Sequence, residues 1–226
     1  MKRLAFAAIA LLAASGALAD TAQSSRAPED DTVWDAAMEA FAAEDHEHAP
    51  PPGGIVFVGS SSIRLWKGLE HQFRDEPVII KRGFGGSRLS DCVHYLDRLV
   101  IRYNPSMVLV YAGDNDLAEG RTPEQVLQEF EAFAHGVHQA LPTTRIAFIS
   151  VKPSPARAAL IPNMRKTNSL VRQYTTGKPW LDFIDVFTPM TDPEGAPRSE
   201  LFQPDALHLN DLGYALWKEA IKPHLR

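Results

Sequence analysis

Residues 55–62, IVFVGSSS, decide the fold of this chain and hold its first candidate for chemistry. Four apolar residues in succession predict a strand that is buried on both faces, as in parallel sheets. A glycine and three serines then predict a tight turn, and apolar residues at helical spacing over 63–69 predict a helix. Hydroxyl groups at such a turn lie beside a helix N-terminus, whose free N–H groups favour negative charge. The turn therefore suits either a serine nucleophile or a phosphate-binding serine.

The rest of the chain repeats this alternation of strand and helix. Further strands are predicted at 78–80, 107–112, 146–150 and 180–186, and helices at 33–45, 89–102, 123–141, 163–174 and 212–221. Strands that alternate with helices imply parallel βαβ units, and right-handed crossovers place the helices on both faces of the sheet. We therefore predict an α/β fold: a three-layer α/β/α sandwich of the flavodoxin-like type, with a central parallel sheet of five strands.

The carboxyl ends of parallel strands meet at one edge of the sheet, where open α/β proteins place their sites. That edge collects the serines at 60–62, the glycines at 85–86 and Asn115, and the loop before the last helix brings Asp205 and His208 within reach. Acyl transfer needs a nucleophile, a base, a group that orients the base, and donors for an oxyanion. Asp205 and His208 are three residues apart, so one turn of backbone can hold the carboxylate against the imidazole.

Two other functions suit the same fold. A flavodoxin-like electron carrier binds a flavin phosphate in the hydroxyl-rich loop after the first strand, but this leaves Asp205 and His208 without a role. A non-catalytic binding module would keep the fold and the pocket without ester turnover. Both alternatives stay open at the level of composition and spacing.

Four short motifs, in this order, resemble the SGNH (GDSL-like) hydrolases. The motifs are Gly59-Ser60-Ser61, Gly85-Gly86-Ser87, Gly113-Asp114-Asn115-Asp116 and Asp205-Ala206-Leu207-His208. The resemblance spans residues 55 to 226. It implies the family's fold and an extracytoplasmic serine esterase that hydrolyses carboxylic esters through an acyl-enzyme, as in secreted or periplasmic members.

Carried over motif by motif, the resemblance implies that Ser61 is the nucleophile, His208 the base and Asp205 its partner. The backbone N–H groups of Ser61 and Gly86 and the amide of Asn115 would form the oxyanion hole. Ser60 stands where the family usually has Asp, which leaves Ser60 and Ser62 as alternative nucleophiles. Such a mechanism needs no metal and no cofactor.

The N-terminal residues are typical of a secretory signal peptide. Lys2 and Arg3 precede an apolar run and a small-x-small pattern, so we expect residues 1–19 to be a signal peptide cleaved after Ala19. Residues 20–54 then form a polar segment, an amphipathic helix and a Pro/Gly linker, and residues 55–226 the catalytic domain. A secreted or periplasmic location follows. The residue directly after Ala19 is Asp20 and not a cysteine, so we expect no lipoprotein anchor in the membrane.

Charge and composition limit the classes of molecule that we expect this protein to bind. Residues 1–19 carry two positive charges and no negative one, so their removal takes the formal net charge from −5 to −7. An acidic protein is poorly suited to nucleic acid or to anionic membranes. We expect a small-molecule or polysaccharide-linked ester as substrate, with short-chain or acetyl esters favoured; hydrolysis and acyl transfer are both allowed. The sequence indicates no oligomeric state.

Several polar residues outside the four motifs also have candidate roles. The run His46-Glu47-His48 is interpreted as a solvated loop rather than a metal site. Arg64, Arg82 and Arg88 lie near the predicted site and are candidates for binding an anionic substrate group. The proline-bearing loop 152–162 follows the fourth strand and is the candidate for lining or gating the pocket.

Overall fold

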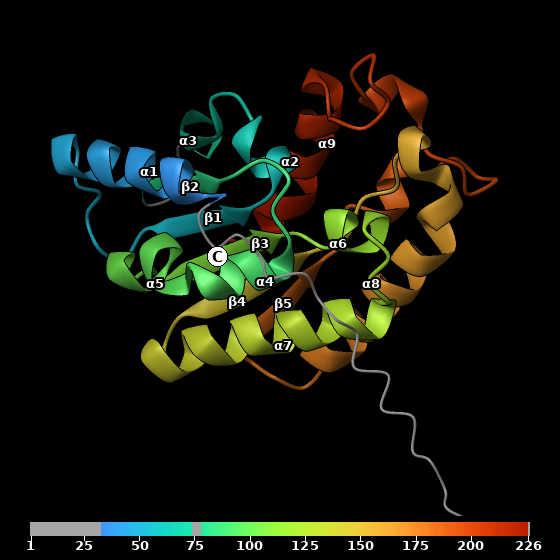
Figure 1. Ribbon diagram of the computed structural model, residues 1–226. Helices are drawn as coiled ribbons and strands as arrows, with labels where there is room; N and C mark the ends of the chain where they lie inside the picture. The colour runs from blue at the N-terminus through green and yellow to red at the C-terminus, as the bar shows by residue number, and fades with distance from the viewer. Residues whose placement is uncertain (1–32, 74–77, 226) are drawn as a thin grey trace, which may run out of the picture.

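Five parallel strands form the centre of the fold in the order β2-β1-β3-β4-β5 (Figure 1). The computed structural model describes residues 33–73 and 78–225, so the expected signal peptide and the polar residues up to 32 lie outside the described residues. The strands are β1 (Ile55–Gly59), β2 (Ile79–Gly83), β3 (Met107–Tyr111), β4 (Arg145–Ile149) and β5 (Leu181–Ile184). The chain passes from β1 to β2 on one side and then crosses to β3 on the other side of β1, so the strand order reverses there, which is where open α/β sheets place their sites.

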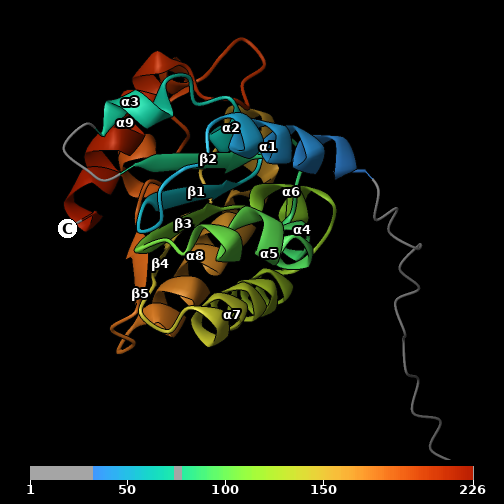
Figure 2. The same ribbon diagram turned by 90° about the vertical axis from the view of Figure 1, so that its left-hand side faces the viewer.

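Helices cover both faces of the sheet, as predicted (Figures 1 and 2). Successive side chains of a strand point to opposite faces, so Val56 and Val58 belong to one core and Ile55 and Phe57 to the other. The first core is covered by α1 (Asp35–Glu47), α4 (Leu89–His94), α5 (Leu96–Leu99), α7 (Pro123–Ala140) and α8 (Ile161–Thr175). The second is covered by α2 (Ser61–Arg64), α3 (Leu69–Gln72) and α9 (Asp211–Ile221). The predicted three-layer α/β/α sandwich is therefore confirmed.

Short helical turns fill the connections at both ends of the sheet. A five-residue helix, α6 (Asp114–Ala118), follows β3 at the carboxyl edge. The 3₁₀ helices are η1 (Ile101–Tyr103), η2 (Pro155–Leu160), η3 (Thr188–Met190), η4 (Ser199–Leu201) and η5 (Lys222–His224). Among the described residues, no helix has the length and apolar character that crossing a bilayer would need.

Three predicted elements differ from the structure. The helix over 63–69 is two short helices, because Gly68 takes a left-handed conformation with φ of 64° and interrupts the turn. The helix over 89–102 is likewise divided into α4, α5 and η1. The run His46-Glu47-His48 is not a loop, since α1 continues to Glu47. In each case the apolar spacing located the segment, but local backbone geometry set its ends.

Strand β2 is longer than predicted and ties α1 to the sheet. Arg82 lies inside the strand, is only 3 % exposed, and forms ion pairs with Glu44 and Asp45 at the end of α1. The phenol of Tyr103 accepts from Arg82 Nε at 2.8 Å and donates to Asp45. Arg82 is therefore occupied in docking α1, and its predicted candidacy for substrate binding is wrong.

Candidate active site

A glycine fixes the turn that carries the first serines. Gly59 ends β1 with φ of +136°, and a Cβ there would lie 1.9 Å from the carbonyl oxygen of Tyr111 on β3. Gly83 ends β2 in a similar way, since its Cβ would lie 2.2 Å from the backbone nitrogen of Arg64. Both glycines let α2 begin at Ser61 in close contact with the sheet. The turn therefore holds Ser61 firmly at the carboxyl edge.

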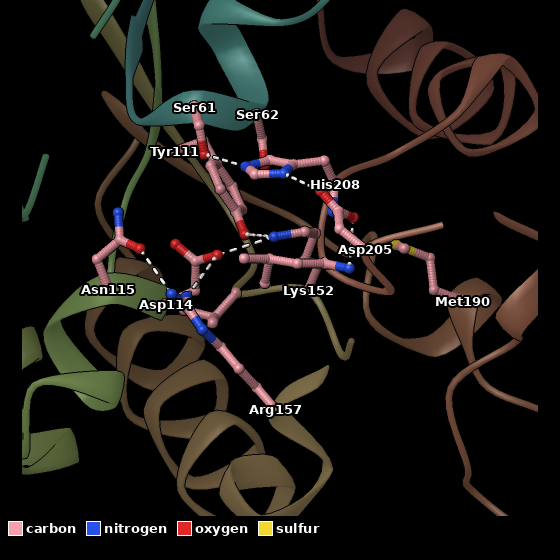
Figure 3. Close-up of polar contacts among 12 residues, drawn as sticks. Ser61, Ser62, Tyr111, Asp114, Asn115, Lys152, Arg157, Met190, Asp205 and His208 are labelled. Carbon is pink, nitrogen blue, oxygen red and sulfur yellow. Dashed lines mark hydrogen bonds and ion pairs between the residues drawn. The ribbon is translucent and has the colours of Figure 1, made fainter. Parts of the chain in front are cut away.

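Ser61, His208 and Asp205 form a continuous chain of hydrogen bonds (Figure 3). Ser61 Oγ lies 3.0 Å from His208 Nε2, and His208 Nδ1 lies 2.6 Å from Asp205 Oδ2. The neighbouring Ser60 and Ser62 are both buried, and their hydroxyl oxygens have no hydrogen-bond partner. Ser61 is thus the serine of the three whose hydroxyl meets the imidazole.

The loop that carries the acid and the imidazole is held by its own backbone. Asp205 Oδ1 accepts from the backbone N–H groups of Leu207 and His208 at 3.0 and 2.9 Å. These bonds, together with the one from the His208 side chain, lower the pKa of Asp205 to about 2. Ala206 between them has φ of 56°, a left-handed conformation that costs energy in a residue other than glycine. The strained residue thus lies in the short loop that keeps the Asp205 carboxylate ionised and the His208 imidazole in one orientation.

The candidate oxyanion donors lie on the next two loops. Gly86 has φ of +83°, and a Cβ there would lie 3.3 Å from Cη2 of Trp34, which precedes α1. Asn115 lies at the start of α6, and its Nδ2 donates to the backbone oxygen of Ser87 at 3.0 Å. An amide nitrogen has two hydrogens, so one remains for a ligand. Figure 3 shows Oδ1 of Asn115 turned toward Arg157 and Nδ2 on the other branch of the amide.

A buried group of charges lies beneath these donors and was not predicted from the sequence. Lys152 Nζ lies 2.8 Å from Asp114 Oδ2 and 3.1 Å from the hydroxyl of Tyr111, and the side chains of Lys152 and Asp114 are 1 % and 5 % exposed. Burial alone would raise the pKa of Asp114, but the charges of Lys152 and Arg157 hold it below its usual value. A lysine three residues after the end of an apolar strand, at the edge that holds the site, was the available signal.

A second buried carboxyl, that of Asp116, lies nearby and differs from Asp114 in its protonation. Asp116 accepts from the backbone N–H of Leu89 at 3.2 Å through Oδ1, while Oδ2 is buried and has no partner. Burial is the main cause that raises the pKa of Asp116 to about 7, and the charges of Asp114 and Asp91 add to it. The third motif therefore holds one carboxylate that is ionised and one carboxyl that keeps its proton in weak acid.

The model of the GDSL-like Lipase/Acylhydrolase family matches residues 55–216 of this chain. The chain belongs to this family. The match covers the sheet and every residue of the four motifs, and the resemblance inferred from them is confirmed. A search of curated proteins gave no significant match.

Solved structures share the fold of this acylhydrolase at low sequence identity. A Streptococcus pneumonia structure provisionally described as a platelet activating factor has a TM-score of 0.75 and 22% identity, with 85% of this chain and 92% of that chain covered. A GDSL-like lipase from Bacteroides thetaiotaomicron has a TM-score of 0.71 and 21% identity, covering 83% and 96%. A carbohydrate esterase of family 3 from Talaromyces cellulolyticus has a TM-score of 0.60 and 16% identity, covering 76% and 96%.

The loop over 152–162 and two arginines complete the surroundings of the acylhydrolase site. The loop contains η2, and the N–H of Ala156 donates to the oxygen of Ala206 at 3.0 Å, so the loop contacts the segment that carries His208. Arg88 pairs with Asp91 and Glu119 at 3.2 and 3.5 Å. Arg64 is exposed and lies against Gly85. Of the three arginines, Arg64 keeps a position from which to meet an anionic group.

Proposed function

We propose that this acylhydrolase is a serine esterase that cleaves carboxylic esters through an acyl-enzyme. The observation that carries the proposal is the chain of contacts from Ser61 Oγ through the imidazole of His208 to the carboxylate of Asp205. A serine hydroxyl becomes a nucleophile when an adjacent base takes its proton and a third group orients that base. The three side chains have the contacts that these roles require.

In the proposed mechanism, Ser61 Oγ attacks the ester carbonyl while His208 Nε2 takes the hydroxyl proton. Asp205 stabilises the imidazolium and keeps Nδ1 protonated. The tetrahedral oxyanion accepts hydrogen bonds from the N–H groups of Ser61 and Gly86 and from Nδ2 of Asn115. His208 then returns the proton to the leaving alcohol as the carbon–oxygen bond breaks. Water, activated by the same imidazole, releases the acid and restores Ser61.

The proposed substrate is a short-chain or acetyl ester, on a small molecule or a polysaccharide. The carboxylate of Asp205 is 47% exposed and His208 24%, so the site is open to solvent and suits an ester presented on a larger molecule. That one similar fold belongs to a carbohydrate esterase supports this class of substrate. A secreted or periplasmic location, given by the sequence pattern before Ala19, is part of the same proposal.

The flavin-binding alternative is less well supported. It gives no role to the contact of Ser61 with His208, and the family of the chain is one of acylhydrolases. A non-catalytic module would share these features, so activity has to decide between the two.

The test is turnover of p-nitrophenyl acetate, butyrate and octanoate by residues 20–226, beside Ser61→Ala and Ser62→Ala. We expect Ser61→Ala to lower kcat by a factor of about 10³ or more, because a triad member is lost. Ser62→Ala is the matched control and should keep most of the activity. Labelling by a serine-directed phosphonate gives a second readout. Wild-type protein that neither turns over an ester nor takes up the label at Ser61 would refute the proposal.

A further inference from the structure

The amide of Asn115 is held from both sides. Its Nδ2 donates to the carbonyl of Ser87 at 3.0 Å, and its Oδ1 accepts from Arg157 Nη2 at 2.9 Å (Figure 3). An asparagine amide can flip by 180° about its last torsion angle, which exchanges the positions of its oxygen and nitrogen. A guanidinium only donates, so the atom of Asn115 that faces Arg157 must be the oxygen. The carbonyl of Ser87 only accepts, so both contacts select the same orientation of the amide, with its nitrogen on the side of Ser87.

Arg157 is itself fixed by a carboxylate. Its Nη1 lies 3.2 Å from Asp114 Oδ2, the same oxygen that Lys152 contacts at 2.8 Å. Arg157 is 18% exposed and comes from η2, in the loop after β4. The guanidinium therefore contacts two neighbouring residues of α6: Nη1 forms an ion pair with the acid without a hydrogen bond, and Nη2 donates to the amide. A planar fork of donors suits this double contact, whereas an ammonium group on a flexible stem does not.

The charges around Asn115 favour negative charge at its free side. Lys152 and Arg157 are two cations that face the one carboxylate of Asp114, which leaves a net positive charge in a buried place. A hydrogen bond from a charged donor is stronger than one from a neutral donor. Donation from Arg157 to the amide oxygen also polarises the amide and strengthens its N–H groups as donors, since hydrogen bonds in series are cooperative.

We propose that Arg157 is a positioning residue for ester hydrolysis, which orients and polarises the amide of Asn115 as an oxyanion donor. This inference rests on the proposed function. Arg157 does not touch the substrate; it acts through Asn115. It follows that Arg157 matters mainly when the oxyanion forms, and so should affect kcat more than KM.

The experiment is a double-mutant cycle with Arg157→Met and Asn115→Ala, measured on p-nitrophenyl acetate. Loss of one oxyanion donor lowers kcat by about 10²–10³, and a residue that acts through that donor must cost less. We expect Arg157→Met to lower kcat by about 10- to 100-fold, with KM changed less than about twofold. In the Asn115→Ala background the same substitution should lower kcat by less than about twofold, because the donor it serves is gone.

The matched control is Arg172→Met. Arg172 lies on the exposed side of α8 and pairs with Asp185, which follows β5. This substitution should leave kcat unchanged. Thermal melting checks that Arg157→Met is folded, as expected because Asp114 keeps Lys152 as its partner. If it is not folded, Arg157→Lys, which keeps the charge, replaces it in the same cycle and should have a lower kcat than the wild type in the Asn115 background only.

The rate of phosphonate labelling at Ser61 provides a readout that does not depend on the choice of ester. It should fall for Arg157→Met in step with kcat, because the phosphonate oxygen occupies the same hole. An equal loss of kcat in the wild-type and Asn115→Ala backgrounds would overturn the role of Arg157, and so would an effect confined to KM. If the wild type turns over esters and Arg157→Met has the same kcat, only this inference is refuted. If the wild type reacts with neither the esters nor the label, the proposed function is refuted.

Discussion

Replacing Asp116 with asparagine should make the stability of the protein less dependent on pH. The carboxyl is buried, its Oδ1 accepts from the N–H of Leu89, and its pKa is raised to about 7 by burial, with Asp114 and Asp91 adding to the effect. The charge of Asp116 also contributes to the raised pKa values of Arg88 and Cys92. Asparagine keeps the shape and the acceptor but carries no charge at any pH.

The sign follows from where the proton binds more tightly. The folded-state pKa of about 7 is above the ordinary value of 3.8, so the folded protein holds this proton more tightly than the unfolded chain. The contribution of Asp116 to stability is complete below pH 4 and is lost as the pH rises through 7. At 1.36 kcal/mol per pKa unit, the loss between pH 5 and pH 8 is about 2 to 3 kcal/mol.

The assay is urea unfolding of wild type and Asp116→Asn at pH 5, 6, 7 and 8. The variant should gain about 2 to 3 kcal/mol on the wild type between the two extremes. A buried amide N–H₂ in the place of the unpartnered Oδ2 costs about 1–3 kcal/mol, but this offset does not vary with pH. Asp97→Asn, at an exposed position of α5, is the matched control and should leave the pH dependence as in the wild type. A free-energy difference between Asp116→Asn and wild type that is the same at all four pH values would refute the reasoning.

Three further outcomes are expected. Gly59→Ala should lower the free energy of unfolding by about 3 kcal/mol or more, through a Cβ too close to the oxygen of Tyr111 and through φ strain, and urea unfolding will measure it. Asp45→Ala leaves the buried guanidinium of Arg82 with one exposed carboxylate and should cost about 3 kcal/mol in the same assay; no loss would contradict the role given to this ion pair. Ester turnover should fall in acid, since His208 acts as a neutral base; a pH–rate profile that stays flat down to about pH 4 would count against that role.

The parallel sheet and the edge at which the motifs meet were predictable because they follow from the alternation of strands and helices. Parallel strands bring their carboxyl ends to one edge, so Ser61 and Asn115, which are far apart in the chain, had to approach each other. The three-residue spacing of Asp205 and His208 likewise limited their separation to one turn of backbone. These inferences needed no knowledge of any side-chain conformation.

Other features depend on packing that a linear sequence does not reveal. Arg82 was placed in a loop because charged residues usually end an apolar strand, but the carboxylates of α1 allow the strand to continue through it. The contact of Arg157 with Asn115 depends on the path of η2, whose one proline and three alanines carry no periodic signal. Gly68 divides a helix that the apolar spacing predicted to be continuous.

The docking of α1 determines where the chain can be truncated for expression. The family model begins at residue 55, after α1 has ended, so a fragment chosen from that boundary would lack the helix. Such a fragment would expose the core surface that Met38 covers, and its yield and solubility would suffer as a result. The smallest piece worth expressing, crystallising or fusing to another protein therefore begins ahead of Trp34.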